Sequence, residues 1–497
     1  MASVLKDKLP LLSKSRFMAG LQCHKRLYLE LFQPELADTV SAAQQLRFDA
    51  GTRVGELARE IFPGGVLISE DHRHHKEAIE STQKALSRNV PAIFEAAFLH
   101  NDVRIRADIL VRVDRDTFDL IEVKSTTEVK EAHLPDVAVQ LYVLEGCGIK
   151  VRRASLCHLN KEYVYQGGEY DLQQLFSIED VTEEAREFLP HVLVLLEEMR
   201  QALWSLEPPE IKPGKQCGKP YPCPFTGHCH ENLPEHHVGQ LPRASEKLLL
   251  SLKEEGIEDI RDIPATFAGL NATQQRVRDC VVDDCVYIDP YLPRVLGRLE
   301  YPIHFLDFET FNPALPVYVG TRPYQVIPFQ WSVHTLTEDG KLRHKEYLHD
   351  GLDDPRESLA KSLLKAFGTD GPIVVYSSFE ATRIRELAEA FPHLSKDLLA
   401  LLDGRIVDLL KLVRDNCYHP EFHGSFSIKS VLPALVTDLD YSGLEISDGE
   451  QASAAYMEMI QPEMSNKRRK ELRRGLLAYC KRDTEAEVRL FNYLRRY

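Results

Sequence analysis

The fold of the first half of this chain is decided by the stretch Arg106–Leu110 (RADIL), followed after a short turn by Leu120–Ser125 (LIEVKS). Both segments are apolar with isolated polar residues, and the turn-forming residues Asp114–Asp116 lie between them. Side chains alternate along a strand, so Glu122 and Lys124 point to one face while the apolar residues beside them point to the other. We therefore predict a β-hairpin that gathers acids and a lysine on one side.

Asp108, Glu122 and Lys124 form a pattern that is typical of metal-dependent phosphodiester hydrolases. Two carboxylates can hold a hard divalent cation such as Mg²⁺ or Mn²⁺, and the ammonium can position the attacking water or the scissile phosphate. The segment Asp136–Leu144 predicts a helix beside the hairpin, from which Gln140 could reach a phosphate or a metal-bound water. The alternative is a solvated strand edge with ordinary charges, next to a helix whose polar edge is Gln140.

The length and composition of the chain bound the class of protein. A chain of 497 residues is too long for one ordinary hydrophobic core, so two or three domains are expected. With 43% hydrophobic and 28% charged residues, the composition is that of a globular protein. The net charge of −15 argues against a nonspecific basic coat. It is compatible with a nuclease that concentrates carboxylates at its sites and confines basic surface to one groove.

The sequence pattern contains no candidate membrane or export segment. No run of 18 apolar residues occurs, and residues 1–8 lack an apolar core segment. We therefore expect a soluble, cytoplasmic protein without membrane partners. Ten cysteines in a cytoplasmic chain of this length are not expected to form a disulfide framework.

Three cysteines stand at equal spacing in a segment rich in proline and glycine: Cys217, Cys223 and Cys229. Thiolates that converge on a metal need turns to bring them together, so this C-x5-C-x5-C pattern predicts a metal or cluster site. A fourth ligand is expected from Cys23, which lies in a basic segment near the start of the chain. Such a site would tie together the two ends of a domain that spans most of the first half.

A second carboxylate pair lies in the second half of the chain. The segment Tyr301–Thr310 predicts a buried strand in which Asp307 and Glu309, at i and i+2, share one face. Two uncompensated carboxylates in an apolar strand are costly, and their presence therefore indicates a site.

Further polar residues follow the strand pair at positions that suit the same site. Glu380 opens a predicted helix directly after the strand expected at residues 372–376. Tyr479 and Asp483 are spaced i,i+4 on the last predicted helix, so both face the same side.

Residues 10–232 resemble the RecB-like PD-(D/E)XK nucleases that carry an iron–sulfur site, as in the CRISPR-associated exonucleases and the AddB-type recombination nucleases. Those proteins set one cysteine before and three after the nuclease core, and their site reads D…ExK followed by a glutamine-containing helix. The chain departs from the pattern in having Gly55 in place of an early histidine and Tyr142 two, not four, residues after the glutamine. The resemblance implies Asp108 and Glu122 as metal ligands, Lys124 as the catalytic lysine, Gln140 as the helix glutamine, and Cys23, Cys217, Cys223 and Cys229 as 4Fe-4S ligands. Zn²⁺ is the alternative to the cluster, with His228 or His230 as a substitute ligand.

The second half resembles the DnaQ-like, RNase H-fold exonucleases of the DEDDy type, and in particular a bacterial family that joins this domain to a RecB-like nuclease. The segments IPFQWS (327–332) and GSFSIKSVLPAL (424–435) are similar to that family too. The resemblance implies that Asp307, Glu309, Glu380 and Asp483 hold two divalent cations and that Tyr479 orients or deprotonates the attacking water. The chain departs from the wider superfamily at Glu380, where an aspartate is usual.

The most basic run of the chain precedes Tyr479 and enters the same predicted helix. Lys467, Arg468 and Arg469 in this run could hold substrate phosphates, and the alternative is a solvated helix start. Residues 236–298 are predicted to be a helical connector. Within it, the segment 248–264 is predicted as helix–Gly–turn–helix, which suits either a helix-hairpin contact to a nucleic-acid backbone or a plain spacer.

Taken together, the sequence predicts an α/β protein with three parts: a PD-(D/E)XK-like nuclease domain at 1–235, the connector at 236–298 and an RNase H-like 3′-5′ exonuclease domain at 299–497. The expected function is hydrolysis of DNA, single-stranded or with 3′ ends, with Mg²⁺ or Mn²⁺, in DNA repair or in defence against foreign DNA. RNA processing is the alternative enzymatic function. A nucleic-acid-binding protein with one inactive site is the alternative of another class. The sequence leaves protein partners open.

Overall fold

The computed structural model of the chain describes residues 10–71 and 73–497. Over these residues the chain forms two compact units. One consists of the described residues up to Asn232 with Pro313–Gln325, and the other of Leu233–Asn312 with Val326–Tyr497. Both units are mixed α/β, as the sequence predicts. None of the helices in the described part of the chain combines the length and the apolar character that crossing a membrane requires.

The sheet of the first unit is built on the predicted hairpin, in which β4 (Val103–Arg112) pairs antiparallel with β5 (Thr117–Lys124). The order is β2-β3-β4-β5-β6-β7, and β1 lies parallel to the start of β4. β5 and β6 are parallel, because α5 carries the chain back between them. The other strands are β1 (Leu12–Ser13), β2 (Val66–Leu67), β3 (Ala92–His100), β6 (Lys150–Leu159) and β7 (Phe176–Asp180).

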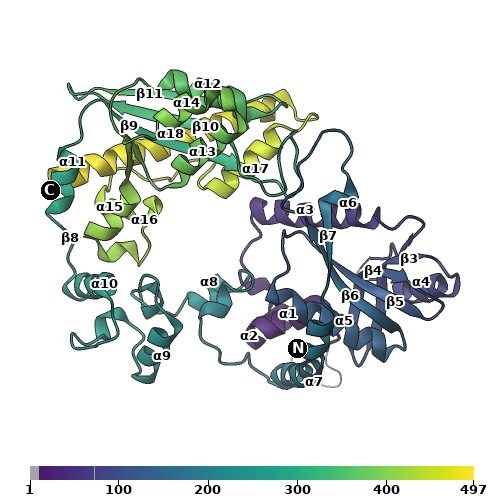
Figure 1. Ribbon diagram of the computed structural model, residues 1–497. Helices are drawn as coiled ribbons and strands as arrows, with labels where there is room; N and C mark the ends of the chain where they lie inside the picture. The colour runs from purple at the N-terminus through teal and green to yellow at the C-terminus, as the bar shows by residue number, and fades with distance from the viewer. Residues whose placement is uncertain (1–9, 72) are drawn as a thin grey trace. The chain divides into compact units, whose positions relative to one another are not determined.

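Different helices cover the two faces of this sheet (Figure 1). Leu110 and Leu120 share a core with α5 (Leu134–Gly146), whereas Ile109 and Ile121 pack with α3 on the opposite face. By strand alternation, Asp108, Glu122 and Lys124 lie on the α5 face, as the sequence predicts. The remaining helices of the unit are α1 (Lys14–Gln22), α2 (His24–Phe32), α3 (Ala42–Arg59), α4 (His75–Ser87), α6 (Leu172–Leu175), α7 (Thr182–Trp204) and α8 (Thr226–His230).

The sheet of the second unit has β9 (Ile303–Phe311) at its centre, in the order β11-β10-β9-β12-β13. β9, β10 and β11 are antiparallel to one another, whereas β12 and β13 run parallel to β9. Leu306 and Phe308 on β9 pack under α12, whereas Phe305 packs against Phe491 of α18. The alternation therefore turns Asp307 and Glu309 toward α18. The other strands are β8 (Tyr287–Ile288), β10 (Ile327–Leu336), β11 (Leu342–Leu348), β12 (Ile373–Val375), β13 (Ile406–Asp408) and β14 (Cys417–Tyr418).

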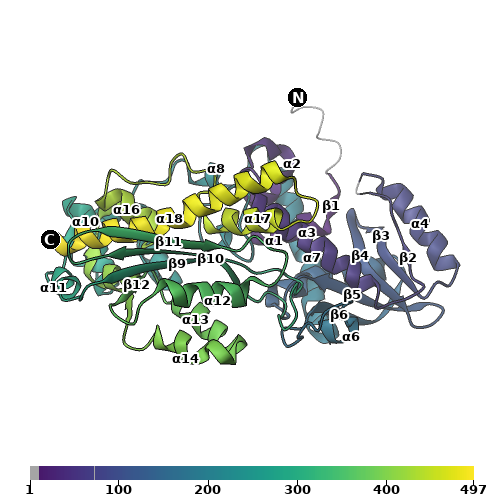
Figure 2. The same cartoon turned by 90° about the horizontal axis from the view of Figure 1, so that it is seen from above.

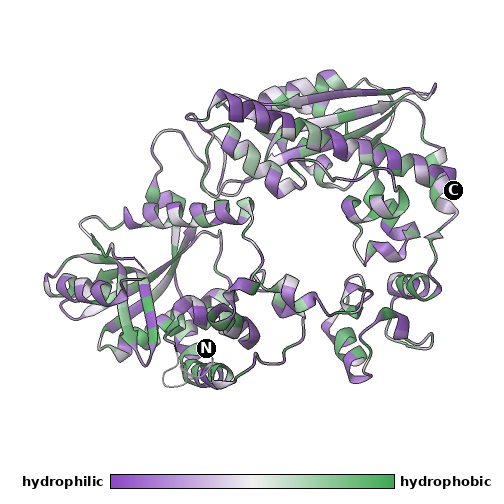
Figure 3. Ribbon diagram, turned by 180° about the vertical axis from the view of Figure 1, so that it is seen from behind, coloured by the Kyte–Doolittle hydropathy of each residue, from purple (hydrophilic) through white to green (hydrophobic). Residues whose placement is uncertain are grey.

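The last helix, α18 (Asn466–Arg496), runs along one face of this sheet, and α12 and α13 lie on the other (Figure 2). Hydrophilic residues cover much of α18, with hydrophobic residues interspersed (Figure 3). The apolar ones, such as Leu490 and Phe491, face the sheet. The remaining helices are α9 (Glu246–Glu254), α10 (Ala272–Asp283), α11 (Tyr291–Gly297), α12 (Pro355–Ala366), α13 (Phe379–Ala390), α14 (Pro392–Ala400), α15 (Leu409–Asn416), α16 (Ile428–Leu435) and α17 (Gly449–Met459).

The structure differs from the expected connector in two respects. Residues 236–298 are part of the second unit, because Leu252 and Val277 share a core with Phe305 of β9. The second helix expected at 260–264 is a 3₁₀ turn, Ile260–Asp262. Pro264 disfavours helical backbone at the residue before it, so the turn stops there. The helix-hairpin contact to a nucleic-acid backbone stays a prediction for this segment.

Candidate functional site

The hairpin of the first unit brings Asp108, Glu122 and Lys124 together. Lys124 Nζ donates to Glu122 Oε1 over 2.8 Å, and Asp108 Oδ2 accepts a hydrogen bond from the Val123 N–H, also over 2.8 Å. Glu122 is buried, at 2% exposure. Buried charges of this kind require partners, so the contacts of Glu122 show how the site is built.

Helix α5 supplies two polar side chains to this site. Gln140, which is fully buried, donates from Nε2 to Glu122 Oε2 over 2.8 Å. Asp136, in the first turn of the same helix, forms an ion pair with Lys124. The helix predicted beside the hairpin therefore does face it, and Gln140 orients the carboxylate of Glu122.

A lysine from the start of the chain reaches the same carboxylates. Lys14, the first residue of α1, has its Nζ 2.6 Å from Glu122 Oε1 and 3.6 Å from Asp136 Oδ1. Hydrogen bonds and ion pairs thus join Lys14 and Lys124 to Glu122 and Asp136, and Asp108 lies near them. The sequence pattern predicts neither Lys14 nor Asp136 as a residue of this site.

The acids of this site have divergent pKa values. Burial raises the pKa of Asp108 to about 7, and the Glu122 charge adds to the increase. Burial also opposes ionisation of Glu122, but Lys124 and Lys14 outweigh it and hold the pKa of Glu122 below its ordinary value. Glu122 is therefore ionised at neutral pH, whereas Asp108 is protonated in part.

The two departures from the expected pattern have visible consequences. A side chain at Gly55 would meet no atom within 4 Å, so the position of the missing histidine is open space. Glu95 of β3 lies near Asp108 and has a φ of 56°, at an irregularity in the pairing of β3 with β4. Arg59 holds it with an ion pair of 2.8 Å. Tyr142 accepts a hydrogen bond from Asn101 and does not contact the hairpin acids.

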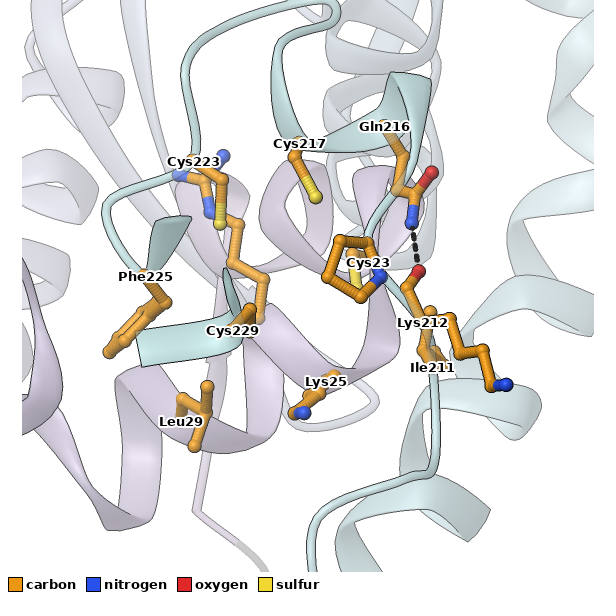
Figure 4. A pocket seen from close by; sticks show the side chains of 12 residues that line it. Cys23, Lys25, Leu29, Ile211, Lys212, Gln216, Cys217, Cys223, Phe225 and Cys229 are labelled. Atoms are coloured by element: carbon orange, nitrogen blue, oxygen red, sulfur yellow. Dashed lines mark hydrogen bonds between the residues drawn. The ribbon is translucent and has the colours of Figure 1, made fainter. Parts of the chain in front are cut away.

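The four predicted cysteine ligands of the first unit line one cavity (Figure 4). Cys23 separates α1 from α2, and the other three come from the segment 217–229, where Cys223 N–H donates to the Cys217 carbonyl over 2.7 Å. Burial raises the pKa of the Cys223 and Cys229 thiols, so the metal-free thiols are held in the neutral form. The structure therefore brings together residues almost two hundred positions apart.

Hydrogen bonds from the N-terminal segment hold the cysteine loop in place. Gln22 Nε2 donates to the carbonyls of Gln216 (2.6 Å) and Tyr221 (2.8 Å). The Asp38 N–H donates to the Pro224 carbonyl over 2.6 Å, and the Asp38 carboxylate accepts from Gly227. Because the loop has little regular structure of its own, these contacts fix the position of the thiols.

The second unit brings Asp307 and Glu309 of β9 together with Cys480 of α18. A ligand atom of each lies within 4.8 Å of those of the other two, a convergence that the described residues show at this triad and not at the cysteine cavity. Cys480 Sγ lies 3.5 Å from Asp307 Oδ2. The triad is a candidate metal position formed by a strand and a helix.

Three more carboxylates border this triad. Asp483 and Glu487 follow Cys480 along α18, and Glu380 opens α13. Glu380 and Glu487 are 5% and 1% exposed, and each has an Oε2 atom without a hydrogen-bond partner. Buried carboxylate oxygens without a partner are rare in proteins, because losing water without compensation is costly.

Burial is the largest cause of the raised pKa values at the second site. Burial raises the pKa of Asp307 well above its ordinary value, and Asp483 and Glu309 contribute next. Burial raises the pKa of Glu380 to about 7 and that of Asp483 to about 6. Without a metal ion, the site therefore holds protons at neutral pH.

Two tyrosines and a lysine surround Asp483. Tyr441 Oη donates to Asp483 Oδ1 over 2.6 Å, and the Tyr441 and Tyr479 rings lie 6.3 Å apart between centroids. Lys429 Nζ lies 5.1 Å from the Tyr479 ring and donates to the Ser447 carbonyl over 2.6 Å. Lys429 also lowers the pKa of Glu309, against the larger effects of burial and Asp483.

The basic run before Tyr479 has many of its charges paired with protein groups. Arg468 forms an ion pair of 2.9 Å with Glu458, and Arg469 donates to the Gln461 carbonyl. The run lies at the start of α18, and a rise of about 1.5 Å per residue sets Arg468 about 16 Å from Tyr479 along the axis. Lys467 lies in the first turn of the same helix. Phosphate contacts by Lys467, Arg468 and Arg469 therefore stay a prediction.

Some site residues that the sequence patterns do not predict still have a local signal in the sequence, and others have none. Lys429 lies inside the segment GSFSIKSVLPAL, whose likeness to a nuclease family was noted without a role for the lysine. Glu487 follows Asp483 by one helical turn, a spacing that could have indicated it. Lys14, Asp136 and Tyr441 carried no local signal, because their partners are distant in sequence.

Comparisons with known proteins add one match. A family described as a domain of unknown function (DUF2779) matches residues 304–427. The matched segment contains Asp307, Glu309 and Glu380 and ends before Lys429 and Asp483. No curated protein matches the chain.

Proposed function

We propose that this chain is a metal-dependent nuclease with two phosphodiester-hydrolysing sites. The observation that carries the proposal is the cluster of buried acids in the second unit, Asp307, Glu309, Glu380 and Asp483. Burial and the neighbouring carboxylates raise the pKa values of Asp307 and Glu309. Such a cluster is costly unless a cation compensates it. Carboxylate oxygens suit Mg²⁺ or Mn²⁺, and the unpartnered Oε2 atom of Glu380 supports that fit.

In the second unit, the chain's own groups would bind and orient the substrate. Divalent cations bound to the acids would stabilise the attacking and leaving oxygens of an in-line displacement. Tyr441 fixes the carboxylate of Asp483, and Tyr479 lies beside it to orient the attacking water. Lys429 is placed to neutralise charge on the phosphate as the reaction proceeds. The strand order β11-β10-β9-β12-β13 supports an RNase H-like exonuclease domain acting on 3′ ends.

The first unit would supply the second nuclease site. Asp108 and Glu122 would hold the cation, Gln140 orients Glu122, and Lys124 would position the water or the scissile phosphate. The hairpin followed by α5 and the parallel strand β6 supports a PD-(D/E)XK-like core.

Cys23, Cys217, Cys223 and Cys229 would hold a 4Fe-4S cluster in this proposal. Thiolates are the ligands of iron–sulfur clusters, and Zn²⁺ on the same four cysteines is the alternative. The lack of secondary structure in the loop supports a structural role, because the cluster would hold its turns.

Cleavage assays test the proposal. The chain is incubated with labelled single-stranded DNA, double-stranded DNA and RNA, with Mg²⁺, Mn²⁺ or EDTA, and compared with Glu122→Gln and Asp307→Asn. We expect metal-dependent cleavage of DNA with free 3′ ends, with each substitution removing one part of the activity. Preference for RNA would assign RNA processing. Retention of nucleic acid without any cleavage would replace the enzyme with a binding protein.

A further inference from the structure

Lys14 has a position that the proposed chemistry of the first unit leaves unexplained. It is the first residue of α1, where the helix dipole disfavours a cation, and it is partly buried, which adds a desolvation cost. Its contacts to Glu122 and Asp136 are therefore what stabilises an ammonium there. Although burial lowers the pKa of Lys14, Asp136, Glu122 and Asp108 raise it above its ordinary value, so the lysine is charged.

The backbone of Lys14 is fixed on both sides. Leu12–Ser13 forms β1, which pairs with β4 at Val103 and Arg104, and the Ser13 hydroxyl caps α1 by accepting from the Arg16 N–H. Helix α1 also packs against α5, which carries Asp136. Movement of Lys14 is thus restricted to its side chain, whose four carbons allow the ammonium several positions around a fixed Cα.

Both oxygens of the Glu122 carboxylate already have partners, and Oε1 has two of them. Oε1 accepts from Lys14 at 2.6 Å and from Lys124 at 2.8 Å, and Oε2 accepts from Gln140 at 2.8 Å. Both lone pairs of Oε1 are in use, so a divalent cation that binds Glu122 through this oxygen must replace one ammonium. A third positive charge at the same oxygen would also be repelled by the two ammonium groups.

Lys14 is held less firmly than Lys124. Lys124 forms hydrogen bonds with both Glu122 and Asp136, whereas the second contact of Lys14, to Asp136 Oδ1, is an ion pair of 3.6 Å. Lys124 also lies on the same strand as Glu122, two residues away. The ammonium that leaves when a cation arrives is therefore that of Lys14.

We propose that Lys14 takes the place of the metal ion at Glu122 Oε1 in the metal-free site and, on metal binding, moves to the scissile phosphate as a second catalytic lysine. This inference rests on the proposed nuclease function of the first unit. It makes the site charge-balanced before the metal binds, and it provides a cation for the substrate once the metal has replaced it. It also predicts opposite effects of Lys14 on metal affinity and on turnover.

The test is a Mn²⁺ titration of the full chain followed by the EPR signal of free Mn²⁺. Asp307→Asn and Asp483→Asn serve as the background, so that binding reports on the first unit. In this background, Lys14→Met should bind Mn²⁺ about tenfold more tightly, because a charged competitor is gone. Lys14→Arg keeps the charge and should bind as the background does. Lys130→Met, an exposed lysine of the same unit, should have no effect.

Single-turnover cleavage of DNA at saturating Mn²⁺ completes the test. Lys14→Met should cleave about tenfold more slowly, because the substrate phosphate has lost a cation. A lysine that only stabilises the fold would not tighten Mn²⁺ binding. Unchanged or weaker Mn²⁺ affinity in Lys14→Met, with Lys14→Arg folded and equal to it, overturns the proposal.

The outcomes separate this proposal from the function on which it rests. If the background chain cleaves DNA with Mn²⁺ but Lys14→Met binds Mn²⁺ no more tightly, the role of Lys14 is wrong and the nuclease site stands. If neither the background chain nor Lys14→Met binds Mn²⁺ or cleaves, both are wrong for the first unit.

Discussion

The two carboxylate sites of this chain balance their charges in different ways. In the first unit, Glu122 is paired with two ammonium groups and an amide, so its pKa is lowered although it is buried. In the second unit, Asp307 and Glu309 lie among other acids, and their pKa values are raised well above the ordinary range. Lys429 opposes this increase from beside the Tyr479 ring.

This difference shows that a buried acid can indicate a site in two ways. Internal lysines keep the first site ionised and ordered without a metal, so a metal has to compete for its ligands. The second site lacks such compensation and should gain stability from any divalent cation that binds it. Metal dependence is therefore expected to be stronger for the stability of the second unit than for that of the first.

The largest effect is expected from removal of a carboxylate in the second unit. Asp307→Asn should lower the rate of 3′-end trimming by about 10³-fold, because several kcal/mol of metal-dependent stabilisation is lost. Asp438→Asn, an exposed acid paired with Arg489 of α18, is the matched control. The assay is release of single nucleotides from end-labelled DNA. Full activity of Asp307→Asn would leave the first unit as the source of any exonuclease activity.

A smaller effect is expected at Lys429. Lys429→Met should lower kcat of the same reaction by about a hundredfold with little change in KM, since the contact is made as charge develops on the phosphate. Lys411→Met, which removes an exposed lysine of the same unit, should keep wild-type rates. An equal loss in both variants would assign the effect to overall charge.

Loss of the cysteine site should lower the activity of the first carboxylate site, because α1 connects the two sites. This helix of nine residues begins at Lys14 and ends at Gln22, next to Cys23. Cys217→Ser should remove the broad visible absorption of anaerobically purified protein and slow the first site by about tenfold, because the supports of Lys14 and Glu122 move. Cys285→Ser, an exposed cysteine of the second unit, is the control. A colourless, zinc-containing wild type would refute the cluster.

The smallest effect concerns stability against pH in EDTA. Glu380 and Asp483 have pKa values raised to about 7 and about 6, so the folded chain retains protons that the unfolded chain releases above about pH 4. The free energy of unfolding of the second unit should therefore fall as pH rises from about 4 to 7. Each kcal/mol lost lowers Tm by about 2–4 °C. The lowered pKa of Glu122 has the opposite sign: its contribution is present above about pH 4.5 and is lost as pH falls.

Thermal unfolding of the wild type and of Asp483→Asn in EDTA checks this prediction. The substitution should make the fall in Tm between pH 5 and 7 smaller, and Mn²⁺ should reverse this fall in the wild type. A Tm of the second unit that rises across this range would contradict the assignment of uncompensated acids to that unit.

Much of the fold was predictable because its signals are local. The alternation in β4 and β5 fixed which face carries Asp108 and Glu122, and the structure confirms it. The same holds for Asp307 and Glu309 on β9. The segment expected as a connector shares a core with β9 of the second unit, since helices of similar amphipathic pattern can pack on a neighbouring domain as readily as span two domains.

The sequence by itself determined which polar residues lie in buried strands and helices, and which cysteines share a loop rich in proline and glycine. Only the tertiary structure decided what compensates them. Lys14 meets Glu122 across 108 positions, and Tyr441 meets Asp483 across 42. The physical reason is that strand and helix periodicity act over a few residues, whereas an ion pair or hydrogen bond depends on the packing of whole elements. The charges of each site are therefore set by the fold.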